Sequence, residues 1–88
     1  MMKLIAQEIE VIAWFTKAGE INPVRFRLKN DDKSNSVIKV DKVISYEEEK
    51  LAGNPMKVFT CQSLINNVMK VYELKFEILT CKWLLWKI

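Results

Sequence analysis

The pattern of apolar and polar positions is that of β-strands along most of the chain. The clearest segment runs from Val24 to Lys29, where three apolar residues alternate with Arg25, Arg27 and Lys29. Because successive side chains of a strand point to opposite faces, this segment predicts one face in the core and one solvated, basic face. The alternation therefore favours a sheet over a bundle of helices.

Residues 8–16 form another predicted strand, which is apolar on both faces at its centre. Its inner face is expected to hold Ile9, Val11, Ala13 and Phe15. Ile12 and Trp14 then point outward. Residues 17–20 include Gly19, which can adopt positive φ, so we expect a turn and a hairpin to the basic strand.

The remaining strands are separated by polar segments. They are predicted at residues 36–46, 57–65, 68–78 and 82–88. Asn66-Asn67 is a predicted tight hairpin turn, because asparagine tolerates positive φ better than most residues. Residues 46–55 contain Glu47-Glu48-Glu49 and a Gly-Asn-Pro sequence, and they leave two alternatives, a short helix or an excursion loop.

These segments predict one all-β domain that spans residues 1–88. We expect a mainly antiparallel sheet of five to six strands, with at most one short helix. A chain of 88 residues has room for a single core. A meander this small must protect its edge strands, so we favour a small, partly open barrel.

Composition and charge place the chain among ordinary folded proteins. Half of the residues are apolar and 28% are charged, and the net charge of +3 arises from acids and bases interleaved along the chain. This balance lacks the clustered basic residues typical of nucleic-acid binding. The N-terminus does not fit a signal peptide, and no segment approaches the ~20 apolar residues of a membrane span. We expect a soluble, cytoplasmic protein with no membrane partner.

Candidate catalytic chemistry is sparse. The sequence has no histidine, which excludes imidazole-based catalysis and the commonest metal ligand. Cys61 and Cys81 lack a Cys-x-x-Cys spacing and are expected to be reduced, and Gly19 and Gly53 stand alone outside any phosphate-binding motif. We predict no enzyme, no cofactor and no metal site, but a non-enzymatic binding or protein-interaction module. A small-molecule-binding barrel or an enzyme is the remotest alternative.

Single-stranded nucleic-acid binding is the second functional hypothesis. Arg25, Arg27 and Lys29 project from one face of a strand at ~6.5–7 Å intervals, a spacing that can follow a phosphate backbone. Stacking of bases requires aromatic side chains beside such a row. The candidates are Trp14, Trp83 and Trp86. The alternative is that the basic row only solubilises the outer face, and that at least one tryptophan lies in the core.

A homodimer is predicted from segments that are apolar on both faces, residues 11–15 and 83–88. If Trp83 and Leu85 fill the core, five large side chains remain uncovered. These are Ile12, Trp14, Leu84, Trp86 and Ile88. An apolar patch of that size usually marks an interface, and a two-fold dimer is the commonest closed assembly. The alternative is that residues 46–56 cover this surface within one chain.

Four segments carry a resemblance to known proteins: "INPVRFRLKN", "VIKVDKVIS", "LAGNPMKVFTCQS" and "VYELKFEILTCKWLLWKI". Together they resemble short uncharacterised all-β proteins of Gram-positive anaerobic bacteria, which implies a bacterial protein without an assigned activity. The order of Pro23 to Arg27, Val40 to Ile44, Tyr72 to Leu74 and Lys82 to Leu85 is also similar to a small domain appended to some Y-family DNA polymerases. That resemblance implies a role linked to DNA.

Overall fold

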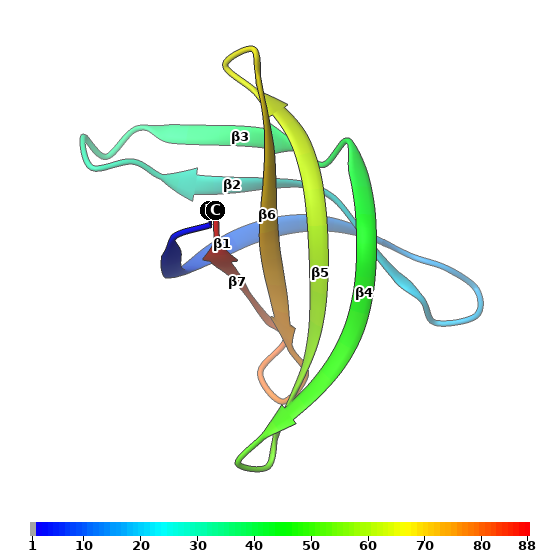
Figure 1. Ribbon diagram of the computed structural model, residues 1–88. Coiled ribbons are helices and arrows are strands. Elements are labelled where there is room, and N and C mark those ends of the chain that lie inside the picture. The colour runs from blue at the N-terminus through cyan, green and yellow to red at the C-terminus, as the bar shows by residue number, and fades with distance from the viewer. Residues whose placement is uncertain (1) are drawn as a thin grey trace.

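A computed structural model describes residues 2–88 and shows the all-β class predicted from the sequence (Figure 1). Its seven strands are β1 (Leu4–Phe15), β2 (Ile21–Lys29), β3 (Asn35–Lys39), β4 (Lys42–Leu51), β5 (Asn54–Ile65), β6 (Val68–Glu77) and β7 (Lys82–Lys87). They form one antiparallel sheet in the order β3-β2-β1-β7-β6-β5-β4. Residues 2–88 include no helix long and apolar enough to cross a membrane.

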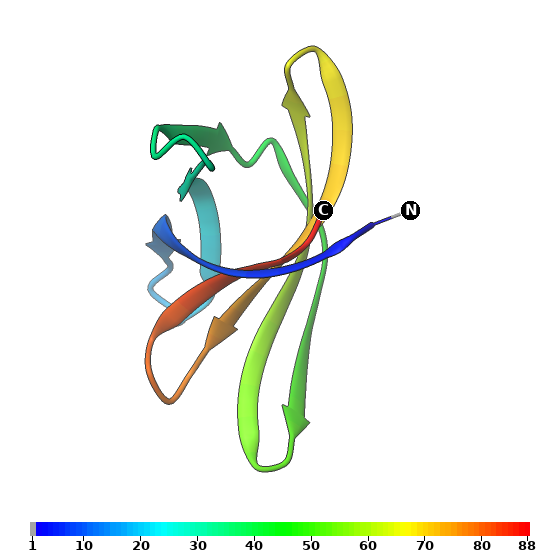
Figure 2. The ribbon, with the colours of Figure 1, turned by 90° about the vertical axis from the view of Figure 1, so that its left-hand side faces the viewer.

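The sheet curls into an open half-barrel because β1 belongs to both of its halves (Figure 2). Residues 4–9 of β1 pair with β7, whereas residues 10–15 pair with β2. The register shifts once in each half, and Ala6 has a φ of 50° within the first shift. Such irregularities bend a strand and increase its twist. They therefore turn the β1–β2–β3 half across the β4–β5–β6 half.

The core lies on the concave face, where aromatic side chains meet. Phe59 and Trp83 have ring centroids 5.5 Å apart, and Phe26 and Tyr72 have centroids 5.4 Å apart. Offset or tilted ring pairs at this separation add to the burial of apolar area. The buried cluster comprises Phe26, Phe59, Cys61, Tyr72, Leu74, Phe76, Trp83 and Leu85. Trp83 and Leu85 thus fill the core, which is the condition from which the homodimer was predicted.

Residues 46–55 are neither a helix nor an excursion loop, so both alternatives predicted from the sequence are wrong. Tyr46–Leu51 extends β4, which pairs with β5 through a two-residue turn at Ala52-Gly53. Both turn residues have positive φ, 50° and 80°, as a tight hairpin with a primed turn requires. The three glutamates stand on an edge strand, where charged side chains discourage pairing with other chains.

The predicted strand over residues 36–46 is in fact two strands, which raises the number of strands to seven. The break lies at Val40-Asp41, where the chain bends from β3 into β4. The Asp41 main-chain N–H donates to the Gln62 carbonyl at 3.1 Å, and the Asp41 carboxylate accepts the Leu64 N–H at 2.8 Å. Both bonds hold the corner between β3 and β4 against β5.

Two predicted hairpins are present in the structure, but the side chain of Phe15 is not where the sequence placed it. Asn66 and Asn67 have φ values of 50° and 64°, which confirms the predicted tight turn. The hairpin of β1 and β2 is also confirmed, but Phe15 is 60% exposed and not in the core. It lies at the end of β1, past the register shift at Ile12/Ala13, where the hairpin projects from the molecule (Figure 1).

Candidate functional site

An apolar groove opens at the end of the half-barrel where β3 and the β5–β6 turn stand on opposite sides (Figure 2). We call it the mouth groove, and it has a volume of about 840 Å³. Its apolar lining is Ile5, Leu28, Val37, Ile38, Leu64, Ile65, Val68, Leu85 and Ile88. Its polar lining is Gln7, Asn30, Ser36, Lys39, Asn66 and Lys70. No Asp or Glu side chain lines it among the described residues.

The volume of the mouth groove falls within the range of ligand sites, and its lining mixes nine apolar with six polar residues. Small-molecule sites are usually concave, ~300–1,000 Å³ in volume and mostly apolar, with a few polar groups, and the mouth of a β-barrel is a common location. Leu85 is buried at the groove, whereas Leu64 and Val68 at its rim remain more than half exposed. The rim therefore presents apolar side chains to solvent without a partner from the described chain.

A buried polar network supports one wall of the mouth groove. The Ser63 hydroxyl donates to the Lys39 carbonyl at 2.6 Å, so β5 holds the end of β3. The Tyr72 hydroxyl lies 2.6 Å from the same Ser63 oxygen. Because serine has one proton, and Lys39 accepts it, Tyr72 must donate to Ser63. Burial raises the pKa of Tyr72 above its ordinary value, which keeps this donor protonated.

A second hollow, of about 830 Å³, has charged walls that neutralise one another. Arg27 donates through Nε to Glu10 at 2.8 Å and also pairs with it through a terminal nitrogen. Lys82 lies 3.2 Å from Glu8. Since these carboxylates already have cationic partners, this hollow offers less unsatisfied binding capacity than the mouth groove.

A smaller hollow of about 390 Å³ lies between the β1–β2 turn and strands β4 and β5. The Tyr46 hydroxyl donates to Glu48 at 2.7 Å, and the Lys57 ammonium donates to the Tyr46 oxygen at 3.0 Å. The bonds from Tyr46 and Lys57 lower the pKa of Glu48, and the bond to Tyr46 raises the pKa of Lys57. These three side chains therefore satisfy each other at neutral pH.

The predicted basic row lies on the outer face of β2. Arg25, Arg27 and Lys29 are all exposed there, while the intervening Phe26 is buried in the core. Arg25 stands between Ile12 and Lys39 in the sheet register. Trp14 is 68% exposed, whereas Trp83 is in the core. Of the three predicted stacking tryptophans, Trp14 is therefore exposed on the strand next to β2, whereas Trp83 is buried and cannot stack on a base.

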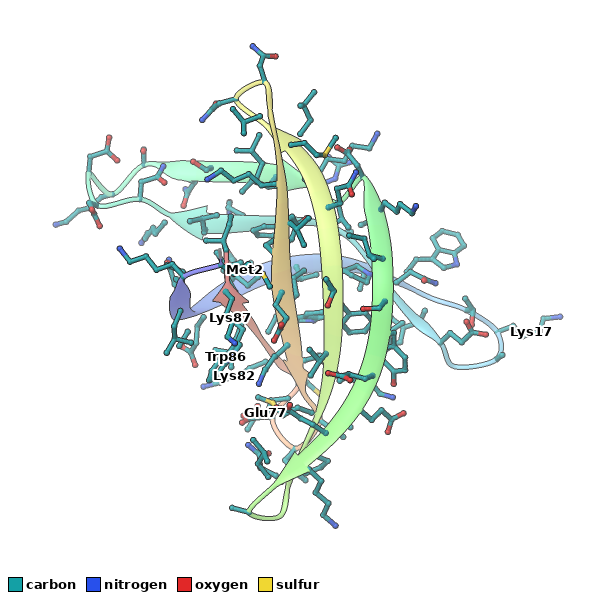
Figure 3. All side chains as sticks on the ribbon, viewed as in Figure 1. Met2, Lys17, Glu77, Lys82, Trp86 and Lys87 are labelled. Carbon is teal, nitrogen blue, oxygen red and sulfur yellow. The ribbon has the colours of Figure 1, made fainter. Side chains whose placement is uncertain are left out.

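The five predicted interface residues occupy three different places. Ile12 and Trp14 are exposed on β1. Leu84 and Trp86 are half-buried on β7, and the Lys75 ammonium lies 4.0 Å from the centre of the Trp86 ring. Figure 3 shows Trp86 along β7 with Lys82 and Lys87, far from Lys17 at the tip of the β1–β2 hairpin.

Ile88 differs from its predicted outward position, because it packs against the core and lines the mouth groove. The chain end is held there by paired main-chain bonds with Lys3, at 2.6 and 3.0 Å. A homodimer stays a prediction, and Ile12 and Trp14 are the most exposed of its five residues.

Sequence reasoning missed the mouth groove, whose lining comes from six strands and the β5–β6 turn. Comparison with protein-family models, curated proteins and solved structures found no match. Within residues 2–88, no three Cys, Asp or Glu side chains are grouped to hold a metal ion. A functional proposal for this half-barrel therefore depends on the chemistry of its surfaces.

Proposed function

We propose that the protein is a non-catalytic binding module whose site is the mouth groove. The observation that carries the proposal is that nine apolar residues, and no Asp or Glu side chain, line a hollow of about 840 Å³. Burial of an apolar ligand against these residues supplies roughly 25 cal/mol for each Å² removed from water. The ligand we propose is therefore an apolar chain.

The sheet supports this function by holding the groove open. Ser63 and Asp41 fix the corner between β3 and β4 against β5, so one wall keeps its position without a ligand. On the other side, the Gln7 amide donates to the Lys29 carbonyl at 3.2 Å and links β1 to β2. A site that is formed before binding loses less conformational freedom when the ligand enters.

Val68 and Val71 provide a matched test of this proposal. Both are exposed valines of β6, but Val68 lines the mouth groove, whereas Val71 lies on the opposite face next to the buried Tyr72. We expect Val68→Asp to weaken binding of decanol by about tenfold, because a carboxylate disfavours burial of an apolar chain. Val71→Asp should change the affinity less than about twofold.

The measurement is displacement of the fluorescent probe N-phenyl-1-naphthylamine by decanol, with circular dichroism to show that both variants are folded. Saturable binding by the wild type and selective loss in Val68→Asp support the proposal. Equal losses in the two variants, or no saturable binding by the wild type, would contradict it.

Single-stranded nucleic-acid binding is the second candidate, and the exposure of Trp14 favours it. Trp14 and Ile12 are exposed on β1, which pairs with the basic strand β2, and Ile12 stands directly opposite Arg25. Arg27 contributes less, because Glu10 already neutralises it.

On this second candidate, an oligothymidylate should bind at low salt and be released as salt increases, because phosphate contacts displace counterions. Trp14→Ala should weaken binding by about fivefold or more, since stacking contributes ~1–3 kcal/mol per base. Lys42→Glu, on the far edge strand, is the control for net charge. No binding at low ionic strength would eliminate this candidate.

A further inference from the structure

Lys70 is the basic side chain on the inner wall of the mouth groove. It stands opposite Ser63 in the β5–β6 register, and directly opposed residues of an antiparallel pair share a face. Ser63 faces the core, so Lys70 also faces inward, at the exposed end of the groove. Lys39 also borders the groove, but its register partner is Arg25 on the outer face.

Lys70 has no carboxylate partner within 4 Å among the described residues. Arg27, Lys57, Lys75 and Lys82 each lie within 4 Å of a glutamate. The groove beside Lys70 is lined by apolar and amide side chains and by no acid. This wall therefore places a cation next to apolar side chains, without an acidic side chain among the lining residues.

We propose that the mouth groove selects a single-chain amphiphile with an anionic head group, specifically an alkyl carboxylate. This inference rests on the proposed function and adds the charge of the ligand. The alkyl chain lies against the apolar lining, and the carboxylate lies at the rim opposite Lys70. The amide group of Asn66 is also at the groove and can donate a hydrogen bond to a carboxylate oxygen.

Three ligands with the same chain length separate charge recognition from burial of the chain: decanoate, decanol and decyltrimethylammonium, each used below its micellar concentration. In the wild type we expect decanoate to bind about fivefold more tightly than decanol, the upper range for an exposed ion pair. Lys70→Gln should remove this preference. Lys70→Glu should favour the ammonium ligand.

Lys42→Glu is the control, because it makes the same charge change on an exposed residue of β4 outside the groove. It should retain the preference for decanoate. Equal binding of decanoate and decanol by the wild type, or equal loss of preference in Lys42→Glu and Lys70→Glu, would overturn the inference and leave the apolar site standing. Failure of all three ligands to bind would instead refute the proposed function.

Discussion

Glu49→Ala is expected to lower the free energy of unfolding by about 2 kcal/mol, whereas Lys75→Met should change it by less than about 1 kcal/mol. Lys75 is only 5% exposed, and its ammonium lies 2.6 Å from Glu49 and over the Trp86 ring. Removing Glu49 leaves this buried charge without its anion. The expected loss lies below that of a fully buried pair, because the Glu49 side chain is 28% exposed.

Methionine has a volume similar to that of lysine and a thioether that can pack against the Trp86 ring, while it removes the charge and the cation–π contact. The double variant should therefore be about as stable as Lys75→Met alone, which identifies the coupling between the two side chains. Urea unfolding measures all three variants, and Glu47→Ala on the same strand is the control. A loss in Glu49→Ala no larger than in Glu47→Ala would show that the pair does not stabilise the fold.

Raising the pH from about 9 to about 11 is expected to lower the free energy of unfolding by about 3 kcal/mol through two core side chains. Burial raises the pKa of the Cys61 thiol from 9.0 to about 12, and it also raises the pKa of Tyr72 above its ordinary 10.0. Each group keeps its proton in the folded state and loses it in the unfolded chain. Their stabilising contribution is therefore complete below about pH 9 and is lost as the pH rises.

The change in the free energy of unfolding per pH unit between about pH 9 and 11 tests the roles of Cys61 and Tyr72 better than the free energy at one pH does. Cys61→Ala and Tyr72→Phe should each flatten the slope, since one titrating group contributes at most ~1.4 kcal/mol per pH unit. Cys81 is exposed, so Cys81→Ala should leave the slope unchanged. Unchanged slopes in both core variants would rule out Cys61 and Tyr72 as the cause of alkaline destabilisation.

The sheet class could be predicted because apolar residues alternate along most strands and polar turns separate them. The structure of residues 46–55 could not be predicted, because apolar and polar residues alternate only weakly in an edge strand whose two faces are both partly solvated. Consecutive glutamates also favour the first turn of a helix, so local chemistry indicated the wrong element. The Ala52-Gly53 turn was hidden as well, since alanine rarely adopts positive φ.

The candidate site could not be predicted because it depends on the curl of the sheet. Leu28 was predicted in the core and Ile88 on the outside, and only the bend of β1 brings their strands to one open end. The burial of Lys75 could not be predicted from the sequence either. This residue alternates with Glu73 and Glu77 as a solvated row would, yet Glu49 and Trp86 cover it.

Binding of an alkyl chain in the mouth groove is tested most directly by titrating the ¹⁵N-labelled protein with decanoate and mapping the amide shifts. The proposed site predicts saturable shifts at residues on both walls, such as Ile38, Ile65 and Lys70, with Trp14 and β4 unaffected. Shifts centred on Trp14 and Arg25, or shifts that spread over the surface without saturation, would contradict it.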